Sequence, residues 1–558
     1  MTFTRYCYSG KPSMRISLKA LANYRLVFLA ATLCALSAST AVAEDFVRQL
    51  QADAVTKGRA SWGHWGVTAD RYSTYGTHSN RLIPVYTFGA KLDDYVGRKS
   101  VYRDPKLLER LYGQLPQSTL NPTADYCDQT DVYYLQRAAI EAGKKYIVLI
   151  IFDGLDWDTT RAAAIYSSQK VGYDSGRGTG LYFQDYQGAP TDFSYFVTSP
   201  HNDGTRADVD AQVVTNVGGR LSGGYDARLG GAAPWLTPSE PAYLLGQSSN
   251  SGSRFHAYTD SASSATSMTC GIKTYNDAIN VDHQGRQFKT IAHFAQQRGY
   301  RVGTVTSVPI SHATPAAAYA HNVWRSDYQD IARDMLGLRS VSHKSQPLPG
   351  LDVAIGTGWG SKKAESRSQG VNYSPGNPFL ADADLAAVDV ANGGKYRVVQ
   401  RQAGIDGAAA LNKAANEAAA KHNRLLGFFG TAAEHLPYAT ADGGYDPAPS
   451  VGAGAEKYGD ADLKENPRLK DMAAAALTVL SAGDGPFWLM IEAGDVDWAN
   501  HANNIDNSIG AIRSGDDAFR TVAAWLEKRN AWKDAVVIVT ADHGHYFVLT
   551  DPKAFTGR

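Results

Sequence analysis

The sequence predicts an α/β protein built on a mostly parallel β-sheet, and three observations point to this class. Short, continuous runs of apolar and β-branched residues recur along the chain of 558 residues. Stretches with the composition of helices separate these runs. Side chains that can bind metals follow the ends of several runs. Strands buried on both faces have such continuous apolar sequences, and their alternation with helices is typical of a parallel sheet.

Five runs are expected to be buried strands, because their apolar residues are continuous instead of alternating with polar ones. They are IPVYTF (83–88), YIVLIIF (146–152), YRVGTVTSV (300–308), FWLMI (487–491) and AVVIVT (535–540). The stretches expected to be helices are FKTIAHFAQQRG (288–299), GAAALNKAANEAAAKHN (407–423) and GDDAFRTVAAWLEKRN (515–530). Two polar or glycine-rich regions, 216–231 and about 340–395, are expected to be surface insertions. Residues 44–558 are therefore expected to form a single domain.

The charge balance excludes some classes of partner. Lys and Arg together number 55, as do Asp and Glu, so the formal net charge is zero. Such a chain is not attracted as a whole to nucleic acid or to anionic membranes. We therefore expect no nucleic acid as a specific partner, although a local cationic pocket is compatible with this balance.

The N-terminus has the features of an export signal. Basic residues precede the apolar stretch LVFLAATLCALSAST (26–40), and AVA at 41–43 offers small residues for cleavage. The apolar stretch is short for a transmembrane helix, which makes a membrane anchor the weaker alternative. Residues 1–43 are therefore predicted to be a signal peptide that begins at Met1 or Met14. We expect the mature protein to be periplasmic or secreted and to have no membrane anchor.

Two cysteines, Cys127 and Cys270, lie outside the predicted signal peptide. An oxidising compartment would let them form a disulfide if they lie close together in the fold. The sequence alone leaves this pairing open.

Side chains that can bind metals follow four of the predicted strands. In chain order they are Asp153, then His312 and Thr314, then Glu492 and Asp497, then Asp542 and His543. A single Asp in such a position is often a helix cap. The carboxyl ends of parallel strands, however, meet at one edge of a sheet. Four such groups together predict a metal site at that edge.

The segment EAGDVDWANHANN places Asp497 and His501 four residues apart, on one face if the segment is helical. The alternative is a solvated acidic loop. Imidazole with carboxylate ligands suits zinc, and a site with Glu, Asp and Thr oxygens suits magnesium.

A second segment, YTDSASSATSMTCG (258–271), supplies a candidate nucleophile. Ser261 follows Asp260 at the start of a predicted helix, where free backbone N–H groups and the helix dipole favour an anion. A serine needs a base or a metal to become a nucleophile at neutral pH. The alternative is a serine-rich helix cap.

Four segments, DSASSAT, SHATPAAAYAH, EAGDVDWANH and VTADHGH, resemble the motifs of the alkaline phosphatase family and occur in the same order. The resemblance extends from about residue 145 to the C-terminus. It implies a three-layer sandwich whose metal site lies at the carboxyl ends of the strands. It also implies hydrolysis of phosphate monoesters through a phosphoserine, two zinc ions and one magnesium ion, and it is compatible with a homodimer.

The resemblance assigns roles residue by residue. Ser261 corresponds to the nucleophile. Arg325, eleven residues after Thr314, falls at the position of the arginine that binds phosphate, and Asp260 would orient it.

The implied metal ligands are Asp153, Asp542 and His543 for the zinc beside Ser261, Asp497 and His501 for the other zinc, and Asp153, Thr314 and Glu492 for magnesium. His312 stands where some members have an aspartate at the magnesium site, and Trp498 where some have a lysine. These departures leave the metal of the third site open. His545 is expected to hydrogen-bond a ligand such as Asp497.

One zinc ligand of the family, a histidine well downstream of the Asp-His pair, has no counterpart after His543. The segment YGTHSNRLIPVYTFG (75–89) resembles the family's element around that histidine, and residues 102–115 resemble the helix that follows it. We therefore predict a circular permutation, in which residues 44–120 correspond to the family's C-terminal segment and 121–558 form the catalytic core. His78 would then complete the zinc site. The alternatives are a surface role for His78 and His64 as the ligand.

Two other functions are compatible with this sequence. A related phosphodiesterase or sulfatase could use a similar pair of metals, but Ser261 and Arg325 favour a dianionic phosphate monoester. A zinc-binding protein without catalytic activity becomes the better interpretation if His78 is not a ligand.

Overall fold

A computed structural model describes residues 45–246 and 256–557. The chain divides into two units, residues 1–46 and 47–558, and the second unit contains the central sheet. The predicted signal peptide, residues 1–43, lies outside the described residues. No helix in the described ranges is long and apolar enough to cross a bilayer.

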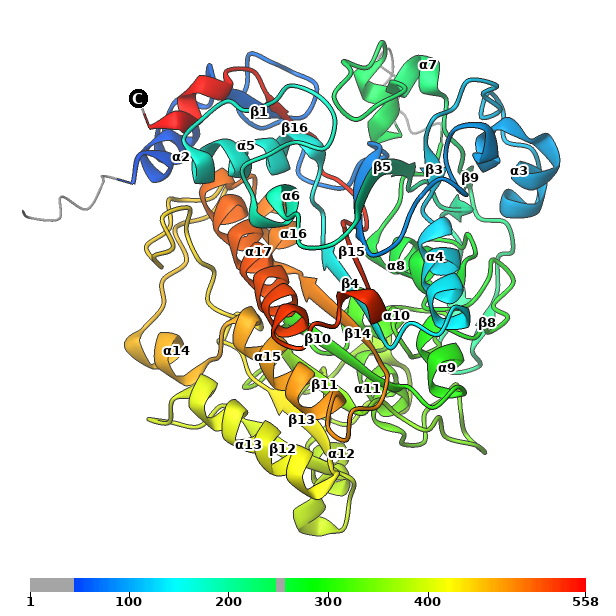
Figure 1. The fold of residues 1–558 in the computed structure, drawn as a ribbon, viewed down its shortest axis with the longest axis vertical. Helices are drawn as coiled ribbons and strands as arrows, with labels where there is room; N and C mark the ends of the chain where they lie inside the picture. Colours follow the sequence, from blue (N-terminus) through cyan, green and yellow to red (C-terminus); the bar gives the residue numbers. More distant parts are fainter. Residues whose placement is uncertain (1–44, 247–255, 558) are drawn as a thin grey trace, which may run out of the picture. The chain divides into compact units, whose positions relative to one another are not determined.

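The described residues form a ten-stranded central sheet in the order β12-β13-β11-β10-β14-β4-β15-β2-β5-β3 (Figure 1). The seven strands from β12 to β15 in this order are parallel to one another, whereas β2 runs antiparallel to both β15 and β5. The bounds are Tyr396–Gln400 (β12), Arg424–Phe428 (β13), Val353–Thr357 (β11), Arg301–Pro309 (β10), Phe487–Ala493 (β14), Tyr146–Phe152 (β4), Ala535–Thr540 (β15), Ile83–Phe88 (β2), Thr191–Val197 (β5) and Cys127–Asp128 (β3). All five predicted strands are present, and the prediction of a mostly parallel sheet is confirmed.

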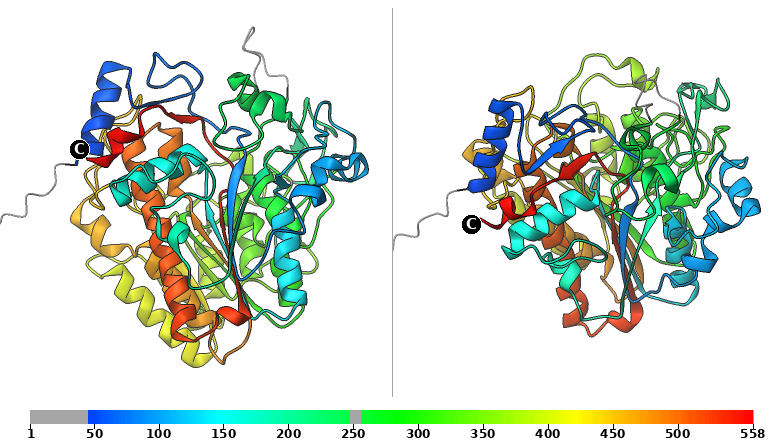
Figure 2. Two further views of the ribbon diagram at one scale, coloured as in Figure 1. Left: turned by 45° about the horizontal axis from the view of Figure 1, so that its top comes forward. Right: turned by 90° about the horizontal axis from the view of Figure 1, so that it is seen from above.

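Helices cover both faces of this sheet, which gives three layers (Figure 2). One face carries α13 (Gly407–Lys421), α15 (Leu469–Leu480) and α17 (Ile505–Lys528). The other carries α4 (Asp131–Glu141), α8 (Ser261–Cys270) and α9 (Ile291–Gln296). The predicted helices correspond to α9, α13 and the second half of α17. The fold is thus an α/β sandwich with a central, mostly parallel sheet.

The expectation of a surface insertion over about 340–395 is wrong in part. Residues Val353–Thr357 form β11, which is buried throughout and lies between β10 and β13. This strand has five residues, one of them a glycine, so it gives a weaker signal than the longer apolar runs. The region 216–231, by contrast, contains only the short β9 (Leu221–Ser222) and α7 (Ala227–Gly230) outside the central sheet.

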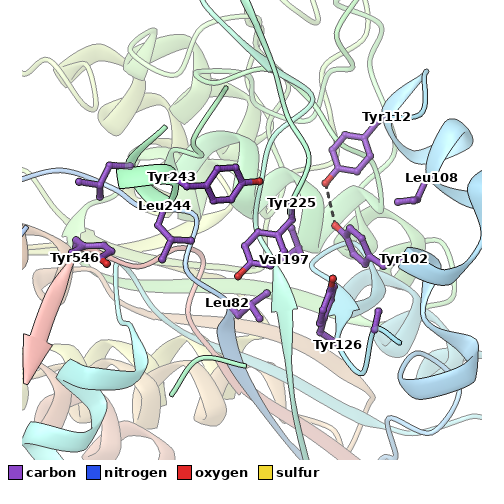
Figure 3. Close-up of a cluster of buried hydrophobic side chains, with 12 residues drawn as sticks. Leu82, Tyr102, Leu108, Tyr112, Tyr126, Val197, Tyr225, Tyr243, Leu244 and Tyr546 are labelled. Carbon is purple, nitrogen blue, oxygen red and sulfur yellow. Dashed lines mark hydrogen bonds between the residues drawn. The ribbon is translucent and has the colours of Figure 1, made fainter. Parts of the chain in front are cut away.

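Strands from the first hundred residues pair with strands near the C-terminus. Strand β2 pairs with β15, and β1 (Gly63–Trp65) pairs antiparallel with β16 (Phe547–Leu549). A cluster of buried hydrophobic residues packs α3 (Pro105–Tyr112) against residues that flank these strands, Leu82 and Tyr546 among them (Figure 3). Within it, the hydroxyl groups of Tyr102 and Tyr112 lie 3.1 Å apart. Residues near both ends of the second unit therefore share one core.

The two cysteines do not form a disulfide. Cys127 and Cys270 are both buried free thiols, so the pairing considered from the sequence is not present. The Cys127 thiol donates to the carbonyl of Tyr195 in the neighbouring β5, and the Cys270 thiol contacts Asn280 Oδ1. Each thiol therefore has its own polar neighbour at a different place in the fold.

Candidate metal centre

The carboxyl ends of three central strands bring the predicted acidic residues together. In the register of the sheet, Ile151 of β4 lies beside Glu492 of β14 on one side and Thr540 of β15 on the other. Asp153 and Asp542 follow the ends of β4 and β15 by one and two residues. Because these strands are parallel and in register, their terminal side chains share one edge of the sheet.

One group of ligand atoms lies around His543. His543 Nε2 is 3.2 Å from Asp153 Oδ1 and 3.6 Å from Asp542 Oδ2. One atom from each of these three residues lies within 4.8 Å of the other two. Two carboxylates and one imidazole in this arrangement can hold a single zinc ion.

Asp542 is held in place by backbone groups. Its Oδ1 accepts hydrogen bonds from the N–H of Gly154 and of His543, at 3.0 and 2.8 Å. The Ser264 hydroxyl donates to Oδ2 at 3.3 Å. Ser264 was not among the residues predicted from the sequence, although it lies three residues after Ser261 on the same face of α8.

A second group lies around Asp497, on α16 (Asp495–His501). Asp497 Oδ1 is 3.5 Å from His501 Nε2 and 3.7 Å from His78 Nε2, and the two histidine nitrogens are 3.1 Å apart. His501 Nδ1 lies 2.6 Å from the carbonyl oxygen of Gly76 and must donate to it. This hydrogen bond leaves a lone pair on His501 Nε2, which is the state that a metal ligand needs.

His545 and His64 occupy different positions relative to this group. His545 Nε2 donates to Asp497 Oδ1 at 2.7 Å, as expected for a residue that orients a ligand. One atom each of His78, Asp497, His543 and His545 lies within 4.8 Å of the others, so His545 is itself within reach of an ion. His64 lies in β1, opposite Val548, and is not part of either group.

Of the residues predicted for a third site, Glu492 and Thr314 come together, and His312 lies two residues before Thr314. Burial raises the pKa of Glu492 to about 7, against the opposing effects of Thr306 and Thr314 beside its carboxyl group. Thr306 donates a hydrogen bond to Glu492 Oε2. Thr306 was not predicted from the sequence, although it is a polar position within an apolar strand. His312 is the N-cap residue of α10 (Ala313–Ala317), and its ring packs on Tyr328, Phe379 and Trp498.

Ser261 is the first residue of α8, and its hydroxyl faces the first group. Ser261 Oγ lies 3.1 Å from His543 Nε2 and 3.5 Å from Asp153 Oδ1. The serine is almost fully buried, with 3% of its surface exposed. The hydroxyl thus stands beside the residues that can hold one ion, at a helix N-terminus that favours anions.

Asp260 connects the helix start to Arg325. Asp260 Oδ1 accepts the N–H of Ser263 at 2.9 Å, which caps α8, and Oδ2 accepts Arg325 Nη1 at 2.9 Å. Asp277 also lies near, and its N–H donates to Asp260 Oδ2. Although burial disfavours the charge of Arg325, Asp260 and Asp277 raise its pKa. A charged guanidinium is therefore fixed against Asp260, the residue that precedes Ser261.

The electrostatics of this centre fit bound cations. Burial raises the pKa of Asp153 well above its usual range, and the carboxylates of Asp542 and Asp497 raise it further. Burial also lowers the pKa of His78 well below its usual value, which favours the neutral ring that a metal requires. Thr314 Oγ1 and Glu492 Oε1 are buried without a hydrogen-bond partner in the part of the chain that is described. Divalent ions would offset the repulsion between the carboxylates and satisfy these oxygens.

Fold and site together define an α/β protein with a buried cluster of side chains that can bind metal ions around a helix-terminal serine. The alkaline phosphatase family model matches residues 242–554, which is more than half of the chain. The chain therefore belongs to the alkaline phosphatase family. The matched span contains Ser261, Arg325 and Asp497, but neither His78 nor Asp153.

Individual relatives agree with this membership. Alkaline phosphatase 4 of Bacillus subtilis is 31% identical over 286 residues, which is 51% of this chain and 49% of the relative. The alkaline phosphatase of Escherichia coli is 30% identical over 305 residues, which is 53% of this chain and 60% of the relative. The chain thus spans about half to three-fifths of the curated relatives it matches. Among solved structures, alkaline phosphatase from the Antarctic bacterium TAB5 has 22% identity and a TM-score of 0.41, covering 72% of this chain and 80% of that chain.

Proposed function

We propose that this protein hydrolyses phosphate monoesters through a phosphoserine at Ser261 and releases inorganic phosphate. The observation that carries the proposal is the position of Ser261 Oγ, 3.1 Å from His543 Nε2 at the N-terminus of α8. Arg325 supplies positive charge and is paired with Asp260, the residue before Ser261. Membership of the alkaline phosphatase family supports the same reaction.

Two zinc ions and one magnesium ion are proposed as cofactors. Asp153, Asp542 and His543 would hold one zinc, and Asp497, His501 and His78 the other. Asp153, Glu492 and Thr314 would hold magnesium, with a role for His312 left as a prediction. When bound, such ions supply the charge that lowers the pKa of a coordinated hydroxyl and stabilises a transferring phosphoryl group.

The chain's own residues perform the remaining steps. The guanidinium of Arg325 can bind two nonbridging oxygens of the phosphate in bidentate fashion, and the N-terminus of α8 favours the same anion. Ser261 Oγ, once deprotonated, attacks phosphorus in line while the bond to the leaving alkoxide breaks. Water then attacks the phosphoserine, the P–Oγ bond breaks, and phosphate and the free serine are released. Asp260 keeps Arg325 in position throughout.

Circular permutation remains our proposal for the organisation of the chain. Residues 44–120 would take the place of the family's C-terminal segment, and residues 121–558 would be the catalytic core. The pairing of β2 with β15 and of β1 with β16 supports this, as does the 3.1 Å distance between His78 and His501. We also propose that residues 1–43 direct export to the periplasm or the medium, and that the mature enzyme is free of a membrane anchor.

Acid-quenched labelling with a radioactive phosphate monoester tests the reaction. Wild-type protein loaded with zinc and magnesium is expected to retain label, and Ser261→Ala to retain none and to lose at least about 10³-fold in turnover. Ser267→Ala is the matched control, because Ser267 lies on the same helix and its hydroxyl bonds only the backbone of Ser263 among the described residues. Faster turnover of a bis-aryl phosphate or an aryl sulfate than of the aryl phosphate would instead assign the protein to the phosphodiesterases or sulfatases. No turnover with metals supplied would favour a binding protein.

A further inference from the structure

A second cluster of metal-capable side chains lies away from the centre described above. It consists of His321, Asp334 and His343, of which Asp334 lies on α11 (Tyr328–Leu336). One ring nitrogen of each histidine and one oxygen of Asp334 lie within 4.8 Å of one another. Asp334 is fully buried and His321 is 5% exposed.

The tautomer of His321 follows from its hydrogen bonds. His321 Nε2 lies 2.7 Å from the carbonyl oxygen of Phe288, so Nε2 carries a proton and donates it. In the neutral ring, Nδ1 then has only a lone pair. Burial lowers the pKa of His321, which favours this neutral ring. His321 Nδ1 is buried and has no hydrogen-bond partner among residues 45–246 and 256–557.

A buried lone pair on a ring that lies close to a carboxylate is a position that a cation can occupy. Asp334 already accepts hydrogen bonds from the N–H of His321 at 3.0 Å and from the Ser340 hydroxyl, so its oxygens are fixed. His343 Nδ1 lies 2.9 Å from Asp334 Oδ1. A network of hydrogen bonds explains the positions of His343 and Asp334, but it leaves His321 Nδ1 without a partner. A metal ion satisfies all three groups at once.

The cluster is open to solvent on one side. A surface pocket of about 490 Å³ is lined by His321, His343, His293, Gln296 and Leu348, among others. His343 keeps 13% of its side chain exposed. The pocket gives an ion a path to the cluster and leaves room for water as further ligands.

We propose that His321, Asp334 and His343 form a second, separate site for a divalent transition-metal ion of the zinc class. Two imidazoles and one carboxylate are ligands that zinc accepts, and water from the pocket completes the coordination. Atoms that each lie about 2 Å from one ion are at most about 4 Å apart, so loading needs only small side-chain rotations. A bound ion would tie the C-terminal end of α11 and the loop at His343 to the segment that carries His321.

Anomalous diffraction at the zinc edge tests the site directly. Crystals of the wild-type protein grown with zinc chloride are expected to give a peak between His321, Asp334 and His343. Zinc peaks in the centre around Asp497 and His543 with none at this cluster would overturn the proposal. This measurement needs no variant and does not depend on catalytic activity.

Zinc content in solution gives an independent measurement. After loading and dialysis, His343→Gln is expected to hold one zinc ion fewer per chain than wild type. The control is His422→Asn, because His422 is exposed and has φ of 55°, a conformation that Asn tolerates. Equal zinc content in all three proteins would contradict the proposal.

Discussion

His78 Nε2 lies 3.1 Å from His501 Nε2, although 423 positions separate the two residues in the chain. Two hydrogen bonds to backbone carbonyls fix this approach. The N–H of Ser79 donates to the carbonyl of Gly544 at 2.8 Å, and His501 Nδ1 donates to the carbonyl of Gly76. The segment around His78 is therefore held against both motifs that carry the predicted zinc ligands.

The first prediction concerns the contribution of His78 to the zinc site. His78→Ala is expected to bind one zinc ion fewer and to lose at least about 100-fold in phosphatase activity, because even loss of a residue behind a ligand costs about 10–100-fold. Zinc analysis and turnover of an aryl phosphate measure these effects. His64→Gln is the control, since His64 lies in β1 outside the metal centre, and it should retain full zinc content. Wild-type zinc content and activity in His78→Ala would exclude both the ligand role and the permuted arrangement of the site.

Much of this centre follows from the sequence because its parts lie at the ends of long apolar runs. The runs that became β4, β14 and β15 are continuous and fully or nearly fully buried, so each marks a strand and an acidic residue at or just past its carboxyl end. The order of the four motifs that resemble the family then predicts which residues at these strand ends share a metal ion.

Continuous apolar runs do not reveal short or half-exposed strands, and two such strands were not predicted from the sequence. β12 is YRVVQ at the edge of the sheet, where four of its five residues are only partly buried, so its polarity resembles that of a loop. β11 is short and contains glycine. The sequence also does not give the distance between residues far apart in the chain. It therefore left open a disulfide between Cys127 and Cys270, which are free thiols in the structure.

A second prediction separates the two roles of Asp260, which caps α8 and holds Arg325. Asp260→Asn keeps an oxygen for the Ser263 N–H but loses the charge that holds Arg325, whereas Asp260→Ala loses both. We expect both variants to raise KM for an aryl phosphate about 10- to 100-fold, as loss of a charge-assisted hydrogen bond of about 1.5–3 kcal/mol implies. Only the alanine variant should also lose the helix cap, which lowers the free energy of unfolding by ~1 kcal/mol. Steady-state kinetics and urea unfolding measure the two effects, and an unchanged KM in both variants would show that Asp260 is only a cap.

A third prediction concerns Gly154, directly after Asp153. Gly154 has φ of +72°, and a Cβ there would lie 2.9 Å from His545 Cδ2 and 3.0 Å from Asp497 Oδ1. Gly154→Ala should therefore displace Asp497 and lower activity about 100-fold, the effect of a shift of about 1 Å near a reacting centre. Gly143→Ala is a matched control, because Gly143 has φ of +79° with no atom within 4 Å of a Cβ. Both variants should lose about 1–2 kcal/mol to backbone strain. Activity normalised to folded protein should fall only in Gly154→Ala, and equal activity in the two would contradict the crowding argument.

The last prediction concerns the balance between buried carboxylates and bound ions. Asp153, Asp542 and Glu492 are each at most 6% exposed and stand at adjoining strand ends. Removing metals with EDTA should therefore lower the melting temperature, since an ion at 100 times its Kd contributes about 2.7 kcal/mol per site. Without metals, the raised pKa of Asp153 means that folding must either bury its charge or protonate it, and both cost stability. Asp153→Asn removes this cost, so the metal-free variant should melt above the metal-free wild type. With zinc and magnesium added, the order should reverse, because the variant has lost a ligand. Differential scanning calorimetry of wild type and Asp153→Asn, each with and without metals, measures these melting temperatures. If EDTA lowers the melting temperature equally in both proteins, Asp153 does not face a bound ion.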